Sequence, residues 1–287
     1  MTRPAATDAP SSSAADAARS RTEAGFDAVA DRYDGETERN PVVVWARRES
    51  QRLLLARFPA GSLLLELGCG TGAEALSLAG SGLRLVATDP SAAMLAQAAA
   101  RMRRAGRTGS VELRRLGAAE AGQLLAEFGP AGFDGAYSGF GPLNCEPDLE
   151  RTAAALHALI RPGGRLIVSL INRFHPFESA WYAAHFDWRR ASRRWGGHAE
   201  GSVSPALPQR VPTRYYTPRA FARRMAPFFR PIDCRALLLL LPPPYLAHLV
   251  TRHPRLATRA ARVERRIAGW PVVRGLGDHY IMELERV

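Results

Sequence analysis

The stretch "LLLELGCGTGAEAL", residues 63–76, combines an acid with closely spaced glycines. An apolar run there ends in Glu66, and Gly68, Gly70 and Gly72 follow at every second position. Glycine permits positive φ angles and lets a ligand approach the backbone closely. The loop therefore predicts a ligand site, and the alternative is a tight strand-to-helix turn that binds nothing.

Glu66 restricts the kind of ligand. A dinucleotide loop has the spacing G-x-G-x-x-G and receives a pyrophosphate at a helix N-terminus. The spacing here is G-x-G-x-G, and Glu66 stands two residues before the first glycine. Because a carboxylate would repel a pyrophosphate, Glu66 favours a cationic or amine-bearing ligand. A nucleotide-dependent oxidoreductase stays an alternative, which nicotinamide binding in solution would support.

Strand-like apolar runs that alternate with helical segments must position these residues. Strands are expected at 62–67, 83–89, 110–116, 133–138 and 165–171. Further strands are expected at 231–241 and 278–286. The pattern predicts an α/β fold with a doubly wound, mainly parallel seven-stranded sheet and helical cap insertions. Ligands of such sheets bind beyond the carboxyl ends of the strands, where Glu66 and Asp89 lie.

Several segments together resemble the class I S-adenosylmethionine-dependent methyltransferases. "LLELGCGTG" resembles the first motif of that family, and "VATDPSAAML" places Asp89 where the family binds the ribose hydroxyls. "LGAAE" stands where the family often has G-D-A-E beside the adenine, while "FDGAYSGFGPLN" and "LIRPGGRLIVSL" match its fourth- and fifth-strand segments. "FDAVADRYD" resembles the helix that closes over the cofactor, with Tyr33 near the methionine end. The resemblance covers about residues 23–171 and implies a Rossmann-like methyltransferase fold.

The resemblance implies S-adenosyl-L-methionine as the cofactor. The residues expected to bind it are Tyr33, Glu66, Gly68, Cys69, Gly70, Gly72, Asp89, Pro90, Met94, Ala119, Glu120 and Ser138. One departure is Ala118, which stands where the family usually has Asp. Backbone groups or Glu120 would then hold the adenine amino group, although Glu120 also fits an acid at a helix N-terminus. Asp89 has a second interpretation as a helix N-cap ahead of Pro90.

The implied reaction is the in-line transfer of a methyl group from a sulfonium, for which alignment of the reactants is the main requirement. A general base is needed only if the acceptor is protonated. The polar candidates near strand ends are Asn144, His175 and His279. A histidine in such a position is more often structural than catalytic, and Asn144 could equally be a turn residue. No set of Asp and Asn residues suggests a metal site, so no metal is expected. A noncatalytic module of the same fold stays an alternative.

The chain is expected to divide into a core with insertions. We expect a disordered tail (1–22), a cofactor-binding core with closing helices (23–171), an acceptor-pocket lid (172–213), further core (214–241), a second helical insertion (242–277) and a last core strand (278–287). Both insertions should lie over the methyl donor. The lid carries Phe174, Phe177, Trp181, Tyr182, Phe186 and Trp188. These form either an aromatic acceptor pocket or the packing of the lid itself.

Net charge is unevenly distributed along the chain. Residues 1–171 hold 19 Arg and 19 Asp plus Glu, whereas residues 172–287 hold 20 Arg and 8 acids and so carry the whole net charge of +12. Such an excess indicates an acidic acceptor, a phospholipid surface or nucleic acid. "RRASRR", residues 189–194, fits either a solvated helix face or a phosphate site.

We favour a small-molecule acceptor of secondary metabolism, anionic or aromatic, whose entrance is lined by arginines. "SGFG" at 138–141 replaces the Asn/Asp-Pro-Pro-aromatic motif of DNA amino-methylating enzymes, so no sequence-specific nucleic-acid binding is expected. The three cysteines form no C-x-x-C pair, which favours a reducing, cytoplasmic location. Stable membrane binding is not favoured, and a lipid or quinone acceptor at a membrane is the second choice.

Overall fold

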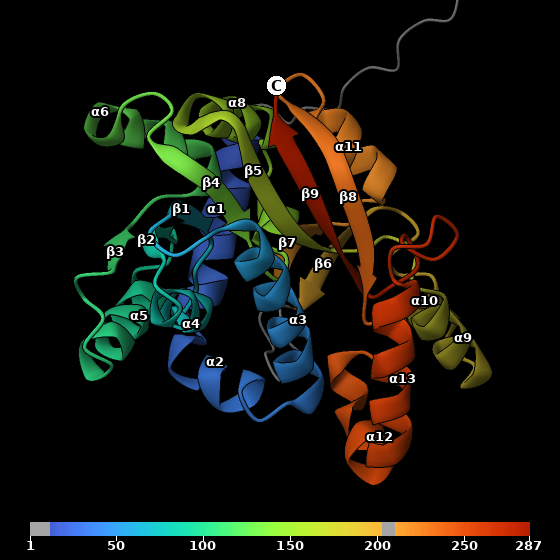
Figure 1. The fold of residues 1–287 in the computed structure, drawn as a ribbon. Helices are drawn as coiled ribbons and strands as arrows, with labels where there is room; N and C mark the ends of the chain where they lie inside the picture. Colours follow the sequence, from blue (N-terminus) through green and yellow to red (C-terminus); the bar gives the residue numbers. More distant parts are fainter. Residues whose placement is uncertain (1–11, 203–209) are drawn as a thin grey trace, which may run out of the picture.

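A seven-stranded sheet forms the centre of the protein in the computed structural model, which describes residues 12–202 and 210–287 (Figure 1). Its strands, in spatial order, are β3 (Val111–Arg114), β2 (Arg84–Thr88), β1 (Leu63–Leu67), β4 (Phe133–Ser138), β5 (Ile160–Ile171), β9 (His279–Arg286) and β8 (Phe229–Leu237). Strands β3 to β5 run parallel, and β9 lies antiparallel between β5 and β8. The predicted doubly wound, mainly parallel sheet is therefore confirmed.

Strand order reverses between β1 and β4, which makes this the switch point of the sheet. The central strands are buried on both faces, and this explains why their sequences are continuous apolar runs. One strand prediction was wrong in part. β8 ends at Leu237 instead of continuing to Leu241, because Leu238 takes a positive φ of 57° that breaks the strand.

Helices cover both faces of the sheet. One face carries η1 (Ala118–Leu124), α6 (Leu125–Phe128), α8 (Leu149–Leu159) and α11 (Pro218–Met225). The other carries α3 (Pro41–Arg57), α4 (Ala73–Gly80), α5 (Ala92–Arg104), α12 (Ala247–Arg252) and α13 (Pro254–Ile267). Two separate apolar cores result, one on each side of the strands.

The N-terminal segment differs from the prediction of a disordered tail over residues 1–22. Residues from 12 onward form α1 (Ser12–Asp27), which is followed by α2 (Ala30–Thr37), while residues 1–11 lie outside the described part. α1 packs on β7 so closely that a Cβ on Gly25 would lie 2.6 Å from Val211 Cγ1. The Ser91 hydroxyl donates to Asp27 at 2.5 Å and ties the end of α1 to α5. Tertiary contacts therefore stabilise a helix that a small, polar sequence did not indicate.

The segment predicted as an acceptor lid, 172–213, forms α9 (Pro176–Ala184), α10 (Trp188–Ala191) and a hairpin of β6 (His198–Ser202) with β7 (Arg210–Arg214). Residues 203–209 lie outside the described part. Phe177 stacks with Trp181 and with His175 of the same segment, whereas Tyr182 stacks with Tyr245 of the second insertion. Phe186 and Trp188 are exposed. The second interpretation of these aromatics, packing within the segment itself, therefore fits the contacts better.

The second insertion is helical, as predicted, and consists of η2 (Pro244–Leu246), α12 and α13. It lies beside α3 (Figure 1), and Asn40 Nδ2 at the start of α3 donates to Pro244 O at 2.9 Å. Over residues 12–202 and 210–287, the structure contains no helix with the length and apolar character that a bilayer span requires.

Candidate active site

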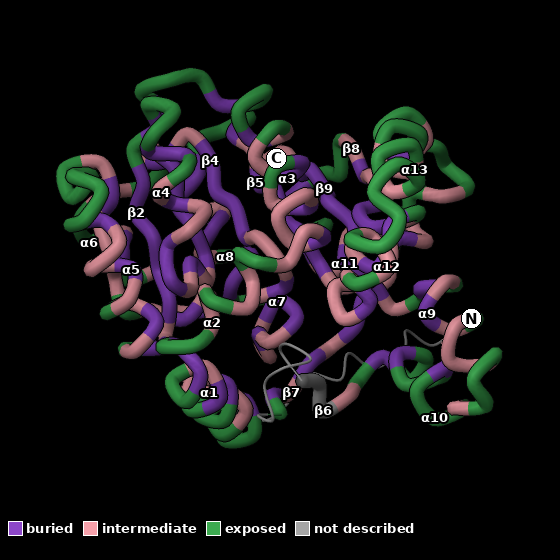
Figure 2. Tube along the Cα trace, turned by 90° about the horizontal axis from the view of Figure 1, so that it is seen from below, coloured by how far each residue is buried: buried purple, intermediate pink, exposed green. Residues whose placement is uncertain are grey.

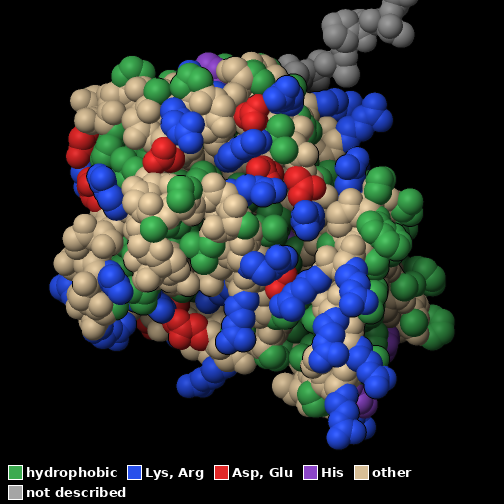
Figure 3. Space-filling model, in the orientation of Figure 1, with side chains coloured by type: hydrophobic (Ala, Val, Ile, Leu, Met, Phe, Trp, Pro, Cys, Tyr) green, Lys and Arg blue, Asp and Glu red, His purple; other side chains and the backbone are tan. Residues whose placement is uncertain are grey.

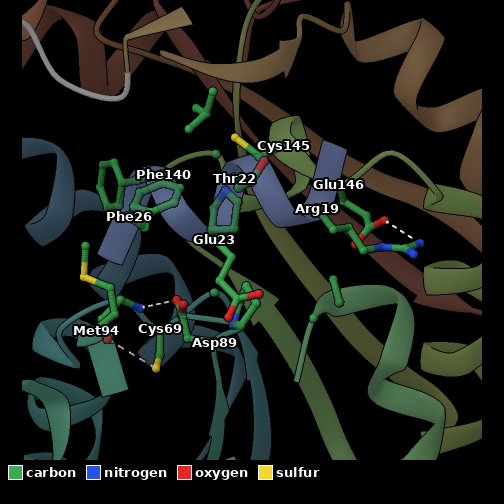
Figure 4. A pocket seen from close by; sticks show the side chains of 18 of the residues that line it. Arg19, Thr22, Glu23, Phe26, Cys69, Asp89, Met94, Phe140, Cys145 and Glu146 are labelled. Atoms are coloured by element: carbon green, nitrogen blue, oxygen red, sulfur yellow. Dashed lines mark hydrogen bonds and ion pairs between the residues drawn. The ribbon is translucent and has the colours of Figure 1, made fainter. Parts of the chain in front are cut away.

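A cavity of about 380 Å³ lies at the carboxyl ends of the parallel strands (Figure 4). Its walls come from the loops after β1, β2, β3 and β4, and from α1 and β7. This is the position at which an open α/β sheet binds its ligand. The expected site and the observed cavity therefore coincide.

The three glycines after β1 differ in how much space surrounds them. Gly68, Gly70 and Gly72 have φ angles of 71°, 52° and 76°, which L side chains rarely adopt. A Cβ on Gly68 would lie 2.3 Å from Pro142 Cβ, and one on Gly72 would lie 3.0 Å from Ala98 Cβ. A Cβ on Gly70 would meet nothing within 4 Å. Packing therefore requires Gly68 and Gly72, whereas Gly70 borders open space in which a ligand would fit.

Asp89 is held in one orientation by the backbone. Its Oδ2 accepts from Gly70 N at 2.8 Å and its Oδ1 accepts from Ser91 N at 2.9 Å. Burial raises the pKa of Asp89 to about 6, although these two amides act in the opposite direction. Each carboxylate oxygen keeps a free lone pair, and Asp89 lines the cavity. The geometry suits a carboxylate that accepts hydrogen bonds from two vicinal hydroxyls.

Glu66 lies behind the cavity wall, with only 2% of its surface exposed. Within the described residues its Oε2 has no hydrogen-bond partner. Burial raises the pKa of Glu66 to about 8, and the negative charge of Glu74 adds to this. The raised pKa favours the protonated, uncharged form of Glu66 beside the glycine loop. A cation bound nearby would favour the ionised form.

An ion pair between Arg47 and Glu74 also lines the cavity, with Arg47 Nε 2.8 Å from Glu74 Oε1. Beside it stands Tyr33, whose pKa burial raises to about 12. The pair presents a cation and an anion to the same region, which matches the carboxylate and ammonium of an amino acid. Sequence analysis missed both residues. Glu74 lies in the glycine motif and could have been found, whereas only the packing of α3 brings Arg47 here.

Glu120 fits both of its predicted roles. It lines the cavity after β3, and its Oε2 also accepts from the backbone N–H of Gly117 at 2.8 Å. The carboxylate therefore caps the start of η1 from within the cavity wall. The backbone at Gly117 and Ala118 completes this wall in place of the missing acidic side chain.

Most of the predicted cofactor residues come together. Those that line the cavity are Tyr33, Gly68, Cys69, Gly70, Asp89, Pro90, Met94 and Glu120. Outside the lining lie Glu66, Gly72, Ala119 and Ser138. Ser138 Oγ donates to Leu67 O at 3.0 Å and so links β4 to β1. Contact of any of these twelve residues with a cofactor stays a prediction.

The three predicted catalytic residues lie outside the cavity lining. Asn144 Nδ2 donates to Ile171 O at 3.1 Å and to Arg214 O at 2.6 Å, and its Oδ1 accepts from Ile171 N at 2.9 Å. The Asn144 side chain thus links the end of β5 to the end of β7 through hydrogen bonds. His175 is buried, and His279 Nδ1 lies 2.8 Å from Asp278 Oδ2. A catalytic role for any of the three stays a prediction without a supporting contact.

His175 belongs to an ionic cluster with Glu178, Arg194 and Asp278, all buried. Arg194 Nη2 lies 2.5 Å from Glu178 and 2.7 Å from Asp278. Burial alone would raise the pKa of Asp278, but the charges of Arg194 and His279 hold it well below its usual range. The acidic and histidine groups lie within 4.8 Å of one another, yet a metal ion there would meet the guanidinium of Arg194. Arg194 therefore neither binds a free phosphate nor lies on a solvated face.

The far end of the cavity is formed by α1, α7 (Pro142–Cys145) and β7. Figure 4 shows Arg19 of α1 pointing toward Glu146, and the shortest separation of their charged groups is 3.5 Å. Phe26 and Phe140 lie next to each other on another side of the same space. Sequence analysis missed Arg19 because its segment was expected to be disordered.

Comparisons with known proteins agree with this geometry. Residues 65–166 match the family model described as a methyltransferase domain. A curated demethylmenaquinone methyltransferase from Thermobifida fusca (strain YX) is 34% identical over 147 residues, which are 50% of this chain and 58% of that protein. The chain thus spans a little over half the length of this relative.

Solved structures share the fold. A 1,6-didemethyltoxoflavin-N1-methyltransferase from Burkholderia thailandensis has a TM-score of 0.56 and 21% identity over 98% of this chain and 92% of that one. The [4+2]-cyclase SpnF has a TM-score of 0.52 and 18% identity over 84% of this chain and 80% of that one. At such identities the likeness concerns the fold alone, and the residues of the site must carry any assignment of chemistry.

Proposed function

We propose that this chain is a class I S-adenosylmethionine-dependent methyltransferase that transfers the methyl group of that cofactor to a small-molecule acceptor, a proposal that the matched methyltransferase domain and the shared fold support. The observation that carries the proposal is Asp89, whose carboxylate is fixed by Gly70 N and Ser91 N at the wall of the cavity. It lies where the ribose hydroxyls of a nucleoside would meet it.

The charged groups around the cavity fit the two ends of such a donor. Asp89 would accept from the ribose, and the backbone at Gly117 would border the adenine. Arg47 and Glu74 would face the carboxylate and ammonium of the methionine part, near Tyr33. The open space beside Gly70 leaves room for the chain that joins the two ends.

When bound, the donor supplies a methyl group on a positively charged sulfur, which is already activated for displacement. The acceptor nucleophile forms a bond to the methyl carbon as the carbon–sulfur bond breaks, and the sulfur keeps the electron pair. This chain would therefore act mainly by alignment, which can lower a barrier by about 7–11 kcal/mol.

The acids that line the cavity already have partners. Asp16 pairs with Arg19 and Glu23 pairs with Arg115. Glu146 accepts from Asp148 N at 2.8 Å. Such engaged carboxylates are poor general bases. We infer that the acceptor either reacts without losing a proton first or releases its proton to water.

For the acceptor we propose a small molecule of secondary metabolism. The Burkholderia structure, which contains bound 1,6-didemethyltoxoflavin, illustrates that the shared fold can hold a small-molecule acceptor. A lipid or quinone is the second candidate. The name of the Thermobifida relative favours it, as do the apolar side chains of Phe140, Ile171 and Val211 on the cavity wall. A cytoplasmic location is also proposed, which the three free cysteines support.

Calorimetry with S-adenosylmethionine and S-adenosylhomocysteine tests the donor site. We expect binding by both ligands in the micromolar range, as about −8 kcal/mol would give. Absence of heat with both would contradict the proposal. Donor carrying an isotopic methyl label, incubated with polar and lipid extracts in separate assays, then tests the acceptor. A mass shift confined to the lipid extract would exclude the first acceptor class, and donor binding without turnover in any extract would support a noncatalytic module.

A further inference from the structure

α13 carries a row of exposed arginines. Arg255, Arg259, Arg262 and Arg266 are spaced four, three and four residues apart, so they lie along one side of the helix. In the described part of the chain, none of these side chains makes an ion pair or hydrogen bond. We call these four residues the arginine row. Figure 3 shows basic side chains gathered as a column over the position of α13.

The opposite side of α13 fixes the direction in which this row points. Ala257, Ala260 and Ala261 pack against the apolar core that contains α3. Glu264 is buried, and its Oε2 accepts from Leu240 N at 2.9 Å. The helix cannot rotate without breaking these contacts, so the arginine row must stay exposed to the surroundings.

Large apolar side chains flank the row. Leu256, Val263 and Trp270 follow one another at intervals of seven residues, and the adjoining turn adds Val272. Their exposed fractions are 66%, 45%, 59% and 82%. We call these four residues the apolar flank. Such a concentration of exposed apolar groups next to a basic stripe is typical of an interaction surface.

We propose that α13 and the turn after it dock onto the surface of an anionic phospholipid bilayer. The arginine row would contact lipid phosphates, and the apolar flank, Trp270 above all, would enter the region between headgroups and acyl chains. A nucleic acid would explain the row but would leave Leu256, Val263 and Val272 exposed. The proposal revises the sequence-based preference against stable membrane contact, because only the folded chain shows row and flank together.

The docking surface does not depend on the proposed function. No residue of the second insertion, 242–277, lines the cavity, so the prediction that this insertion lies over the methyl donor was wrong. Vesicle binding can therefore be measured without donor or acceptor. A protein that failed to bind donor could still bind vesicles, and the reverse holds as well. The two proposals can therefore fail separately.

Sedimentation of the full chain with vesicles provides the test. We expect binding to phosphatidylcholine vesicles with roughly 30% phosphatidylglycerol, little binding to phosphatidylcholine alone, and release as salt rises from about 0.05 M to about 0.5 M. The triple change R255Q/R259Q/R262Q should lower partitioning about hundredfold, at about fivefold for each arginine. R255K/R259K/R262K keeps the charge and should retain most of the binding.

A matched control removes the same charge elsewhere. R103Q/R104Q/R107Q changes exposed arginines at and beyond the end of α5, which lies on the opposite side of the molecule from α13 (Figures 1 and 2). It should leave vesicle binding within about twofold of the parent, since contact with the bilayer is local. An equal loss in both triple variants would show diffuse attraction and overturn the assignment to α13.

The apolar flank has its own readout. Vesicles that carry brominated acyl chains should quench the emission of Trp270, and W270S should remove that quenching while donor binding stays intact. L256S/V263S should lower binding to anionic vesicles about tenfold, given the area of exposed apolar surface lost. Failure of the full chain to bind anionic vesicles would refute the proposal. Binding of a nucleic-acid duplex to the arginine row would also refute it, if L256S/V263S and W270S bind vesicles as the parent does.

Discussion

The arginines around the cavity and those of α13 behave in opposite ways. Arg47 pairs with Glu74, and Arg101 lies 2.6 Å from Asp34 and 2.7 Å from Glu38. These pairs join α2 and α3 to the glycine loop and to α5. Within residues 12–202 and 210–287, no acid pairs with the arginine row of α13. Arginine in this chain therefore stabilises the closed cavity in one region and remains available to an external partner in the other.

The contrast explains the uneven charge of the sequence. Residues 1–171 hold as many acids as arginines, and some of these acids form structural pairs such as Arg47–Glu74 and Arg101–Asp34, whereas an arginine that meets an anionic partner needs no acid nearby. The C-terminal part is not uniform, however. Arg194 is buried between Glu178 and Asp278, so some of the 20 arginines there are also structural. The arginine row, not the whole C-terminal part, is the distinct region.

The largest expected effect is a change in stability with pH, and it concerns Glu66 beside the cavity. The folded pKa of about 8 exceeds the usual 4.5, so the folded chain holds a proton that the unfolded chain loses between these values. The free energy of unfolding of the donor-free protein should thus fall, by a few kcal/mol, as pH rises from 4.5 to 8. Glu66→Gln should remove the part of this slope that lies above pH 6, where Asp89 contributes little.

Urea unfolding at a series of pH values measures the effect. Burial raises the pKa of Asp89 to about 6 and that of Glu66 to about 8, so the slope well above pH 6 belongs mainly to Glu66. Glu127→Gln, which changes an exposed acid paired with Arg114, should leave the slope unchanged. Equal slopes for the parent and Glu66→Gln would refute the assignment.

The next effect concerns space in the cavity. Gly70→Val would place a branched side chain where a Cβ has no protein neighbour, so donor affinity should fall by about 3 kcal/mol or more. Gly106→Val is the matched control, since Gly106 also has a positive φ, of 64°, and no neighbour within 4 Å but lies outside the cavity. Both should lose similar stability, and only Gly70→Val should lose donor binding in calorimetry.

A smaller effect is expected at Asp89. Asp89→Ala should weaken donor binding by about 1.5–3 kcal/mol, the range for a hydrogen bond that involves a charged group. Asp134→Ala is the control, because Asp134 Oδ2 accepts from Leu63 N at the start of β1, outside the cavity lining. Unchanged donor affinity in Asp89→Ala would show that the ribose lies elsewhere.

The smallest effect tests whether the two regions are independent. R255Q/R259Q/R262Q should change donor affinity by less than about 0.5 kcal/mol, as for surface changes at a distance. α13 is linked to the cavity through α3, because Arg265 lies 2.5 Å from Glu49 of α3 and Arg47 of the same helix lines the cavity. A change well above this limit in calorimetry would mean that α3 couples the basic surface to Arg47.

Local sequence features predict the strands of the sheet and the part of the cavity wall that contains Gly70 and Asp89. The apolar runs of β1, β2 and β4 and the loop after β1 are local features, because burial on both faces and positive φ angles restrict which residues can stand there. Gly70 and Asp89 could therefore be assigned before any contact was known. The order of strands then placed both residues at one edge.

Which residues complete the cavity wall, and which partner each charged side chain has, depends on tertiary packing. Arg47 and Arg19 reach the cavity from helices far along the chain from the glycine loop, and their spacing in the sequence carries no trace of that contact. Arg194 and Arg259 look alike in the sequence, yet one is buried between two acids and the other is exposed on α13. An ion pair forms through space, so only the packing of the elements distinguishes a structural arginine from one that is free to bind.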